Sequence, residues 1–243
     1  MEERLQKILA RAGFGSRRNC EELIRQRRVL VNGQIAILGQ KANPEQDQIT
    51  VDGQPVRTDR SFTYIALYKP RGVLSAERDD SGRLRTVRDL VPLPGHLYPV
   101  GRLDLKSEGL ILLTNDGELA NLLTHPRYEH PKEYYVDLEG HPEDEALERW
   151  RRGLFVDGRR TAPADVSVVG RKKDYTRLRI VLREGRKRQI RKIAAQLGHP
   201  VRRLIRVRIG PVQLGDLQPE QWRPLSKSEL KQLRKLKQQK SSR

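Results

Sequence analysis

The chain has 243 residues, and its 49 Lys and Arg outnumber its 31 Asp and Glu, which gives a formal net charge of +18. This charge favours a polyanionic partner, because a nucleic acid offsets the self-repulsion of the chain and releases counterions on binding. The longest apolar runs, such as residues 110–113, are far shorter than the ~20 residues that span a bilayer. We therefore expect a nucleic-acid-binding protein without a membrane segment.

Cysteine and histidine usage argues against disulfides and metal sites. The single cysteine, Cys20, has no partner for an intrachain disulfide, which fits a reducing cytoplasm. The start of the chain lacks the basic and apolar regions of a signal peptide. We therefore expect a cytoplasmic protein. We also expect no metal site, because four of the five histidines precede proline and belong to no ligand cluster: His125, His130, His141 and His199.

The first elements are predicted by local patterns. Apolar residues at helical spacing over residues 5–12 indicate a short helix, and Ser16 is placed to cap a second helix. The pair Asn32-Gly33 stands between two apolar runs, 29–31 and 34–36, which is a strong signal for a β-hairpin. These patterns predict a compact N-terminal unit of two helices and a small sheet.

Six arginines lie between Arg11 and Arg28, on or beside these two helices. With the motifs at 4–7, 15–18 and 29–33, the region resembles the S4 RNA-binding domain over residues 1–58. The resemblance implies that arginines of this unit face RNA phosphates, among them Arg17, Arg18 and Arg28. The alternative is that these arginines only coat a solvated helix.

A basic run dominates the later part of the chain, between Arg171 and Arg208. Within it, Arg188 and Arg191 are three residues apart and would share a face if both lie on a helix. Asp104 is an acid in the loop 101–109, directly before an apolar strand, where a loop can hold a catalytic group on a rigid element. The pattern alone also fits an ordinary turn residue.

Five ordered motifs resemble the RsuA/RluB family of ribosomal RNA pseudouridine synthases. They are Tyr68-Lys69-Pro70-Arg71-Gly72, Gly101-Arg102-Leu103-Asp104 with Ser107 and Gly109-Leu110, Lys132-Glu133-Tyr134, Glu184-Gly185 with Arg188-Gln189-Ile190-Arg191, and Leu204 to Gly210. Together with the S4-like region, the resemblance covers nearly the whole chain. It implies an α+β protein in which a small S4-like domain precedes a larger catalytic domain with a mainly antiparallel sheet.

The expected organisation follows from this resemblance and from the composition. Residues 1–58 form the S4-like domain, 59–61 a polar linker, 62–232 the catalytic domain and 233–243 a basic C-terminal tail. A capping box at residues 226–229 predicts a helix near the end of the chain. We expect a monomer by default.

The resemblance implies an isomerase that converts uridine to pseudouridine in ribosomal RNA, with large-subunit RNA favoured as the target. No atoms are gained and no redox change occurs, so no cofactor is expected. The implied catalytic residues are Asp104, Tyr134 and Arg191, and the implied substrate-binding residues are Lys69, Arg102, Arg188 and Gln189.

Two points stay open at this stage. Asp104 attacks the sugar C1′ directly or removes a ribose proton to form a glycal, and Arg188 is an alternative to Arg191 as its cationic partner. The rival functions are a non-catalytic protein that binds RNA or assists ribosome assembly, and an RNA methyltransferase. The methyltransferase is disfavoured because no Gly-rich cofactor loop is found.

Overall fold

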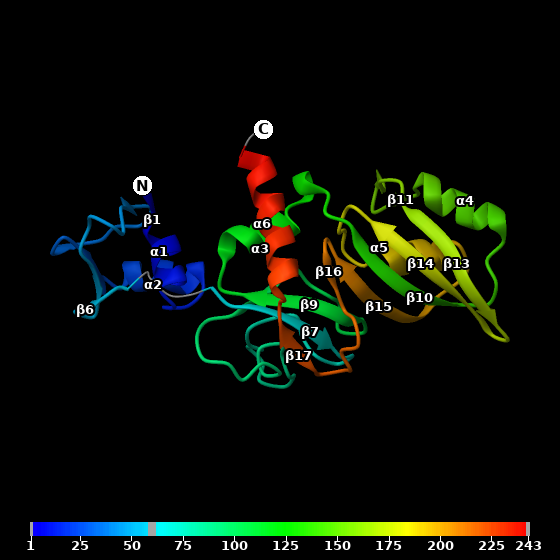
Figure 1. Ribbon diagram of the computed structural model, residues 1–243, viewed down its shortest axis with the longest axis horizontal. Coiled ribbons are helices and arrows are strands. Elements are labelled where there is room, and N and C mark those ends of the chain that lie inside the picture. Colours follow the sequence, from blue (N-terminus) through cyan, green and yellow to red (C-terminus); the bar gives the residue numbers. More distant parts are fainter. Residues whose placement is uncertain (1, 58–61, 242–243) are drawn as a thin grey trace. The chain divides into compact units, whose positions relative to one another are not determined.

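The computed structural model describes residues 2–57 and 62–241, with side chains described as far as residue 236. The chain forms two compact units (Figure 1): one of residues 1–63 with the segments 93–97 and 115–117, and one of the remaining residues. The expected linker at 59–61 lies outside the described residues. Helices and mainly antiparallel strands make up both units, which confirms the α+β prediction.

The first unit contains two helices and small sheets. Helices α1 (Leu5–Arg11) and α2 (Arg17–Arg25) bury Leu5, Ile8, Leu9, Cys20 and Ile24 against the sheet β3-β2-β5-β6. The strand bounds are β1 Glu3–Arg4, β2 Val29–Val31, β3 Gln34–Ile35, β4 Lys41–Ala42, β5 Ile49–Val51 and β6 Gln54–Pro55.

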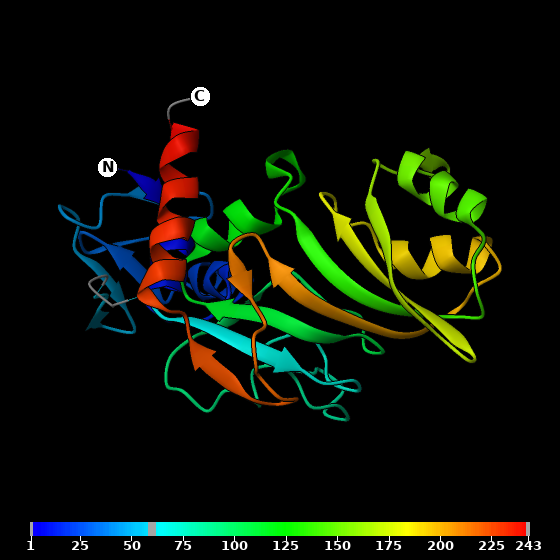
Figure 2. The same cartoon turned by 45° about the vertical axis from the view of Figure 1, so that its right-hand side comes forward.

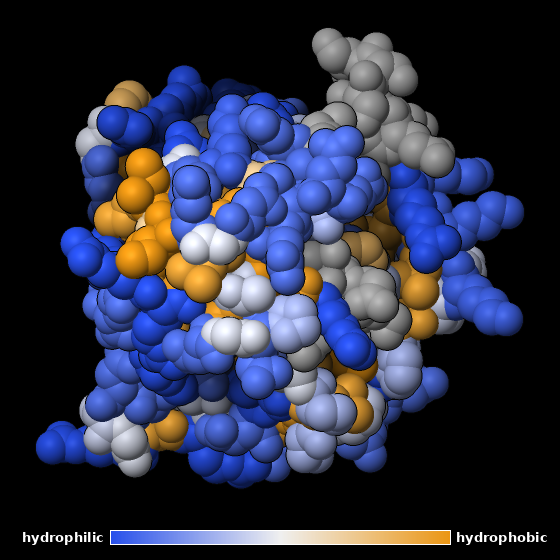
Figure 3. All heavy atoms as spheres, turned by 90° about the vertical axis from the view of Figure 1, so that its left-hand side faces the viewer, coloured by the Kyte–Doolittle hydropathy of each residue, from blue (hydrophilic) through white to orange (hydrophobic). Residues whose placement is uncertain are grey.

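Local signals in this unit are confirmed. The Ser16 side chain caps α2 by accepting a hydrogen bond from the Asn19 N–H at 3.2 Å. Asn32 and Gly33 both adopt positive φ angles, 54° and 78°, and join β2 to β3 in the tight turn that an Asn-Gly pair favours. Figure 3 shows a mainly hydrophilic face of the molecule, in which hydrophobic residues form smaller areas.

Within the described residues, the second unit contains a nine-stranded sheet with the order β13-β14-β10-β15-β9-β7-β17, to which β8 and β16 are added. Strand β15 pairs with β9 in parallel, whereas the other strand pairs of this sheet are antiparallel. The bounds are β7 Tyr64–Lys69, β8 Tyr98–Val100, β9 Glu108–Thr114, β10 Lys132–Glu139, β13 Asp165–Lys172, β14 Tyr175–Leu182, β15 Val201–Ile209, β16 Val212–Gln213 and β17 Trp222–Pro224.

Gly109 makes the parallel contact between β9 and β15 possible. It pairs with Arg206, and its φ of +105° lies in the region that favours glycine. A Cβ atom at this position would lie 2.3 Å from the Arg206 carbonyl oxygen, so any side chain would push the two strands apart. This contact joins β7 and β9 to β10 and β14 in one sheet.

Helices cover different parts of this sheet (Figure 2). Helices α4 (Asp144–Arg152) and α5 (Gln189–Gln196) pack on the side of β10 and β14 that carries Tyr134, Val136 and Leu138. We call this side the helix face, and the side that carries Glu133, Tyr135 and Asp137 the open face. The other elements are α3 (Gly117–Thr124), which packs with α6 (Lys227–Ser241) against a second hydrophobic cluster, the short helix Pro126–Tyr128, and the hairpin of β11 (Phe155–Val156) and β12 (Arg159–Arg160).

The C-terminal helix begins at the predicted capping box. The Ser226 hydroxyl accepts a hydrogen bond from the Glu229 N–H, and the Glu229 carboxylate accepts one from the Ser226 N–H. Helix α6 continues without a break across residues 232 and 233, where the sequence places the start of the tail, and Leu233 is buried in the core of the second unit.

Candidate active site

A pocket of about 610 Å³ opens on the helix face of the second unit. Its walls come from the loop 101–107, the start of β10, the segment 185–191 that leads into α5, and β15. Six of the residues expected at the site line it: Arg102, Asp104, Tyr134, Arg188, Gln189 and Arg191. Lys69 does not line this pocket, and Arg17, Arg18 and Arg28 belong to the first unit.

Backbone hydrogen bonds hold the loop that carries Asp104. The Asp104 carbonyl accepts from the Ser107 N–H at 2.9 Å, and the Leu105 carbonyl accepts from the Gly72 N–H at 2.9 Å. The Ser75 hydroxyl bonds both the N–H and the carbonyl of Leu103, at 3.0 and 2.9 Å. The carboxylate is therefore carried by a loop that is fixed on both sides of it.

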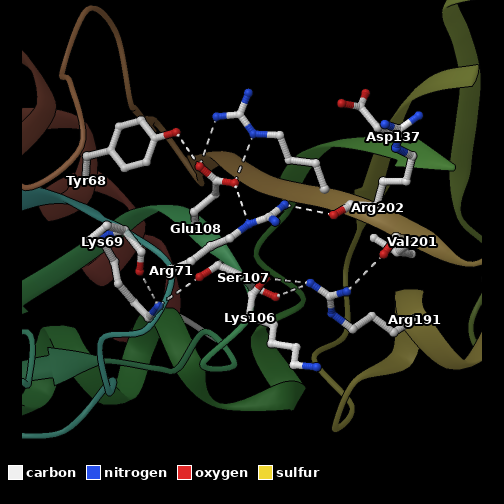
Figure 4. A network of polar contacts seen from close by, with 12 residues as sticks. Tyr68, Lys69, Arg71, Lys106, Ser107, Glu108, Asp137, Arg191, Val201 and Arg202 are labelled. Carbon is white, nitrogen blue, oxygen red and sulfur yellow. Dashed lines mark hydrogen bonds and ion pairs between the residues drawn. The ribbon is translucent and has the colours of Figure 1, made fainter. Parts of the chain in front are cut away.

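Lys69 belongs to the scaffold of this loop. Its side chain is fully buried, and Nζ donates to the carbonyl oxygens of Pro70 and Ser107, both at 2.8 Å (Figure 4). Burial lowers the pKa of Lys69 to about 8, although the nearby charges of Glu108 and Asp104 oppose this shift. The expectation that Lys69 contacts RNA is wrong for this structure, because solvent and ligands do not reach the ammonium group.

Arg191 lies beside the Asp104 loop without forming an ion pair with Asp104. Its Nη2 donates to the Lys106 carbonyl at 2.8 Å and to the Ser107 hydroxyl at 3.2 Å, as Figure 4 shows. Burial lowers the pKa of Arg191, and the charge of Asp104 acts in the opposite direction. Among the described residues, the Asp104 carboxylate has no cationic partner within 4.0 Å, and the buried Arg191 Nε has no hydrogen-bond partner.

Arg188 and Arg191 do not share a helix face, because only Arg191 lies on a helix. Arg188 precedes α5 as its cap residue and adopts a left-handed conformation with a φ of 55°. Gln189 is buried, and its side-chain amide donates to Glu184 at 2.6 Å and accepts from the Arg186 N–H at 3.3 Å. Gln189 thus closes the basic loop, while Arg188 and Arg191 approach the pocket from different backbone settings.

Tyr134 and Tyr135 point to opposite faces of β10, as alternation along a strand predicts. Tyr134 is buried in the helix-face core and lines the pocket. Tyr135 is half-buried and pairs across the strands with Arg179, on the open face.

Two further cations in the pocket were not predicted. Arg206 is buried, donates to the Leu110 carbonyl at 2.8 Å and to the Arg102 carbonyl at 3.3 Å, and its Nη2 has no partner among the described residues. Burial, and secondly the charge of Arg206, lowers the pKa of Lys132. Lys132 could have been found from its place two residues before Tyr134 on the same face of a strand.

Glu108 ties the end of the Asp104 loop to neighbouring strands. Arg203 binds its carboxylate in a bidentate arrangement at 2.9 and 3.0 Å, Arg71 binds it at 3.0 Å, and the Tyr68 hydroxyl donates to it at 3.1 Å (Figure 4). Burial acts to raise the pKa of Glu108, but Arg203, Tyr68 and Arg71 outweigh it and hold the pKa below its ordinary value.

The chain matches two protein families in the expected order. The S4 domain family matches residues 3–44, and the RNA pseudouridylate synthase family matches residues 63–196. A solved structure of a pseudouridylate synthase is 30% identical, covers 95% of this chain and 99% of its own, and superposes with a TM-score of 0.69.

Curated relatives match over almost the full length. An RNA pseudouridine synthase of Aquifex aeolicus (strain VF5) is 43% identical over 96% of this chain and 94% of its own. The ribosomal large subunit pseudouridine synthase B of Bacillus subtilis (strain 168) is 42% identical over 96% of both chains.

These matches define an RNA-modifying enzyme with an S4 domain. The chain belongs to the RNA pseudouridylate synthase family, and it isomerises uridine to pseudouridine in RNA. The family resemblance expected from the motifs is confirmed, and the rival methyltransferase and the purely binding protein are set aside. In the described part of the chain, no helix has the length and apolar character needed to cross a membrane.

Proposed function

We propose that the substrate is ribosomal RNA of the large subunit. The support is the 42% identity, over 96% of both chains, to a relative that is named for the large ribosomal subunit. The S4 domain and the net charge of +18 fit a large structured RNA. A monomeric state and a cytoplasmic location stay predictions of the sequence.

We further propose that Asp104 is the group that acts on the ribose. The observation that carries this proposal is the charge distribution in the pocket. Among the described residues that line it, Asp104 is the one acid, and it faces seven cations: Arg102, Lys132, Arg186, Lys187, Arg188, Arg191 and Arg206. Such a lining suits a polyanionic substrate, and it leaves Asp104 as the one carboxylate of the described lining that could act as a nucleophile or a base on the ribose.

The reaction breaks the bond between N1 of uracil and C1′ and forms a bond between C5 and C1′. In one route the Asp104 carboxylate attacks C1′, uracil leaves as an anion, and C5 of the rotated base then displaces the carboxylate. In the other route the carboxylate removes the ribose 2′ proton, uracil leaves and a glycal forms; C5 of the rotated base then bonds to C1′ while the carboxyl group returns the proton to C2′. In both routes the proton on C5 must leave, and the base gains its N1 proton, so atoms balance.

The pocket cations and Tyr134 have separate roles in this proposal. Arg191 and Arg206 stabilise the negative charge that develops on the departing uracil, because fixed cations in a partly dry site act strongly on new charge. Tyr134 supports the base after it has left its stack, and its hydroxyl takes part in the proton transfer. Arg102 and Arg188 hold phosphates near the target nucleotide.

The S4 unit supplies RNA affinity outside the chemistry. Arg17 and Arg18 stand exposed in the first turn of α2, where positive charge opposes the helix dipole. A bound phosphate removes this unfavourable arrangement. Arg28 forms an ion pair with Asp52, so its charge is partly used within the unit.

The experiment that tests the proposal is the substitution Asp104→Asn. We expect the variant to fold, to bind a large-subunit ribosomal RNA transcript as well as the parent, and to form no pseudouridine in a single-turnover assay. Asn keeps the shape of the side chain but provides neither a nucleophile nor a base. The matched control is Asp174→Asn in the exposed turn between β13 and β14, which should keep the parental rate.

The outcome that overturns the role of Asp104 is pseudouridine formation by Asp104→Asn at the parental rate. The choice of substrate is tested separately by mapping pseudouridine in both ribosomal RNAs from cells with and without the gene. A lost modification in small-subunit RNA alone would overturn the large-subunit proposal.

A further inference from the structure

The open face of the sheet carries a regular set of arginines that the reaction does not use. Strand alternation places Arg177 and Arg179 of β14, and Arg203 of β15, on the same side as Glu133 and Asp137. Arg208 binds Glu133, and Arg71 binds Glu108 and the Arg202 carbonyl at 2.9 Å (Figure 4). Arg202 is the extra residue at the irregularity of β15 opposite Asp137 and Leu138, and its guanidinium group lies over the ring of Tyr175 on this face. We call these the arginine ladder: Arg71, Arg177, Arg179, Arg202, Arg203 and Arg208.

Carboxylates below the ladder fix the orientation of three guanidinium groups. Arg177 binds Asp137 through Nε and Nη2 at 2.7 and 2.9 Å, and Arg179 binds Glu133 through the same pair of atoms at 2.6 and 3.2 Å. Arg203 binds Glu108 in the same way. Each of these arginines uses one edge of its planar group, which leaves the N–H donors of the other edge for a further partner.

The exposed fractions show which charge meets the solvent. The carboxylate side chains of Glu108, Asp137 and Glu133 are 8%, 11% and 13% exposed. The paired arginine side chains are 31% to 46% exposed: Arg208, Arg177, Arg179, Arg203 and Arg71. The face therefore presents its positive charge outward and keeps its negative charge underneath.

Cations also outnumber acids on this face. The six arginines stand against Glu108, Glu133 and Asp137, and against five acids when the exposed Asp165 of the edge strand β13 and the exposed Glu139 at the end of β10 are counted. Arg202 forms no ion pair among the described residues and lies 5.2 Å from the centre of the Tyr175 ring. Charge that only stabilised the sheet would need no such excess, because one cation per carboxylate satisfies the pairs.

We propose that the arginine ladder binds the phosphate backbone of a second segment of the RNA substrate, on the side of the sheet opposite to the pocket. Planar guanidinium groups with a free edge match the geometry of phosphate oxygens. The ladder spans β14, β10 and β15 and continues to Arg71, so it offers several phosphate contacts in a row. The proposal rests on RNA as the substrate class and is independent of the role of Asp104.

The test measures how RNA affinity depends on salt, with a full-length large-subunit ribosomal RNA transcript as the probe. The logarithm of the association constant falls with the logarithm of the salt concentration, and each lost phosphate contact makes this dependence less steep by about 0.7 to 0.9. We expect this decrease for Arg202→Ala, which breaks no ion pair. We expect a similar decrease for the neutral pair Arg177→Gln with Asp137→Asn, which leaves no buried charge without a partner.

Arg149→Ala is the matched control, because Arg149 is equally an exposed arginine but lies on α4, on the helix face. It should leave the slope unchanged. Thermal unfolding verifies that each variant is folded, and a variant that unfolds early is replaced by Arg202→Gln. If the slope and the affinity of both ladder variants equal those of the parent, the proposal is wrong, and an acidic protein segment becomes the alternative partner.

Failure of this proposal and failure of the proposed function give different results. Binding and its salt slope are measured without turnover, so an active Asp104→Asn variant would not affect them. Conversely, unchanged slopes in the ladder variants would leave the chemistry at Asp104 untouched.

Discussion

The two faces of strands β10, β14 and β15 differ in how their charged side chains are paired. On the open face, Glu108 and Glu133 each bind two arginines and Asp137 binds one in a bidentate arrangement. On the helix face, the described residues give Asp104 no ion pair, and nitrogens of Arg191 and Arg206 are buried without a partner.

The difference shows where polar groups find their partners within the chain and where such partners are missing. A buried polar group without a hydrogen bond costs about 1–3 kcal/mol, and native proteins tolerate few of them. Two of the four such side-chain atoms among the described residues belong to this pocket, which is explained if the RNA substrate supplies their missing partners. The same sheet thus carries paired charges on its open face and polar groups without partners at the pocket of its helix face.

The largest effect in this comparison is expected when a cation of the pocket is removed, and little effect is expected for an exposed arginine elsewhere. Arg191→Gln should lower the single-turnover rate by about 10²–10³, because a fixed charge that stabilises the transition state is lost. Arg149→Gln should keep the parental rate. Equal rates for both variants, measured at saturating RNA, would contradict the assignment of Arg191 to the reaction.

The two neighbouring tyrosines of β10 compare the faces directly. Tyr134→Ala should lower the single-turnover rate by about 10² or more, because it removes the ring and the hydroxyl from the pocket. Tyr135→Phe should change the rate little, since the ring on the open face is kept. Melting temperatures control for stability, and similar rate losses in two stable variants would mean that the faces are wrongly assigned.

The buried Lys69, which holds the loop that carries Asp104, makes the stability of the fold depend on pH. Its pKa is about 8 in the folded chain, below the ordinary 10.5, so the unfolded chain holds more protons between these values. The free energy of unfolding should therefore rise between pH 8 and 10.5, by about 3 kcal/mol at most. Urea unfolding across this range should show the rise in the parent and a flatter profile in Lys69→Met, and identical profiles would contradict it.

The smallest effect is expected for Glu108, and its pH dependence has the opposite direction. Its folded pKa lies below the ordinary 4.5, so its stabilisation is present above pH 4.5 and is lost as the pH falls through the folded pKa. Glu108→Gln should lower the free energy of unfolding by about 2 kcal/mol near neutral pH. Urea unfolding should show that this difference shrinks in acid, and a constant difference would speak against an ionised Glu108.

Local chemistry explains which elements could be predicted from the sequence. The Asn32-Gly33 hairpin, the Ser16 cap and the capping box at 226–229 depend on neighbours within a few residues, and all are confirmed. The loop position of Asp104 before a buried strand is confirmed for the same reason. The family resemblance contributed the grouping of Tyr134 and Arg191 with Asp104.

Contacts between distant segments could not be predicted. The burial of Lys69 and Arg206 depends on how β7, β9 and β15 pack, and the pairing of β9 with β15 joins residues 108–109 to residues 205–206. The left-handed conformation of Arg188 removed the helix face that spacing suggested. In these cases the sequence spacing is compatible with several arrangements, and tertiary packing selects one.

The parallel pairing of β9 with β15 also sets the order in which a newly made chain gains its abilities. The strands of the first unit end at Pro55, whereas the pocket needs Arg206 and its strand, which ends at Ile209. At a synthesis rate of 5–20 residues per second, this separation corresponds to about 8–30 s. During that interval the residues of the S4 domain have been synthesised, whereas the catalytic pocket is still incomplete. The chain therefore gains its RNA-binding domain before its active site.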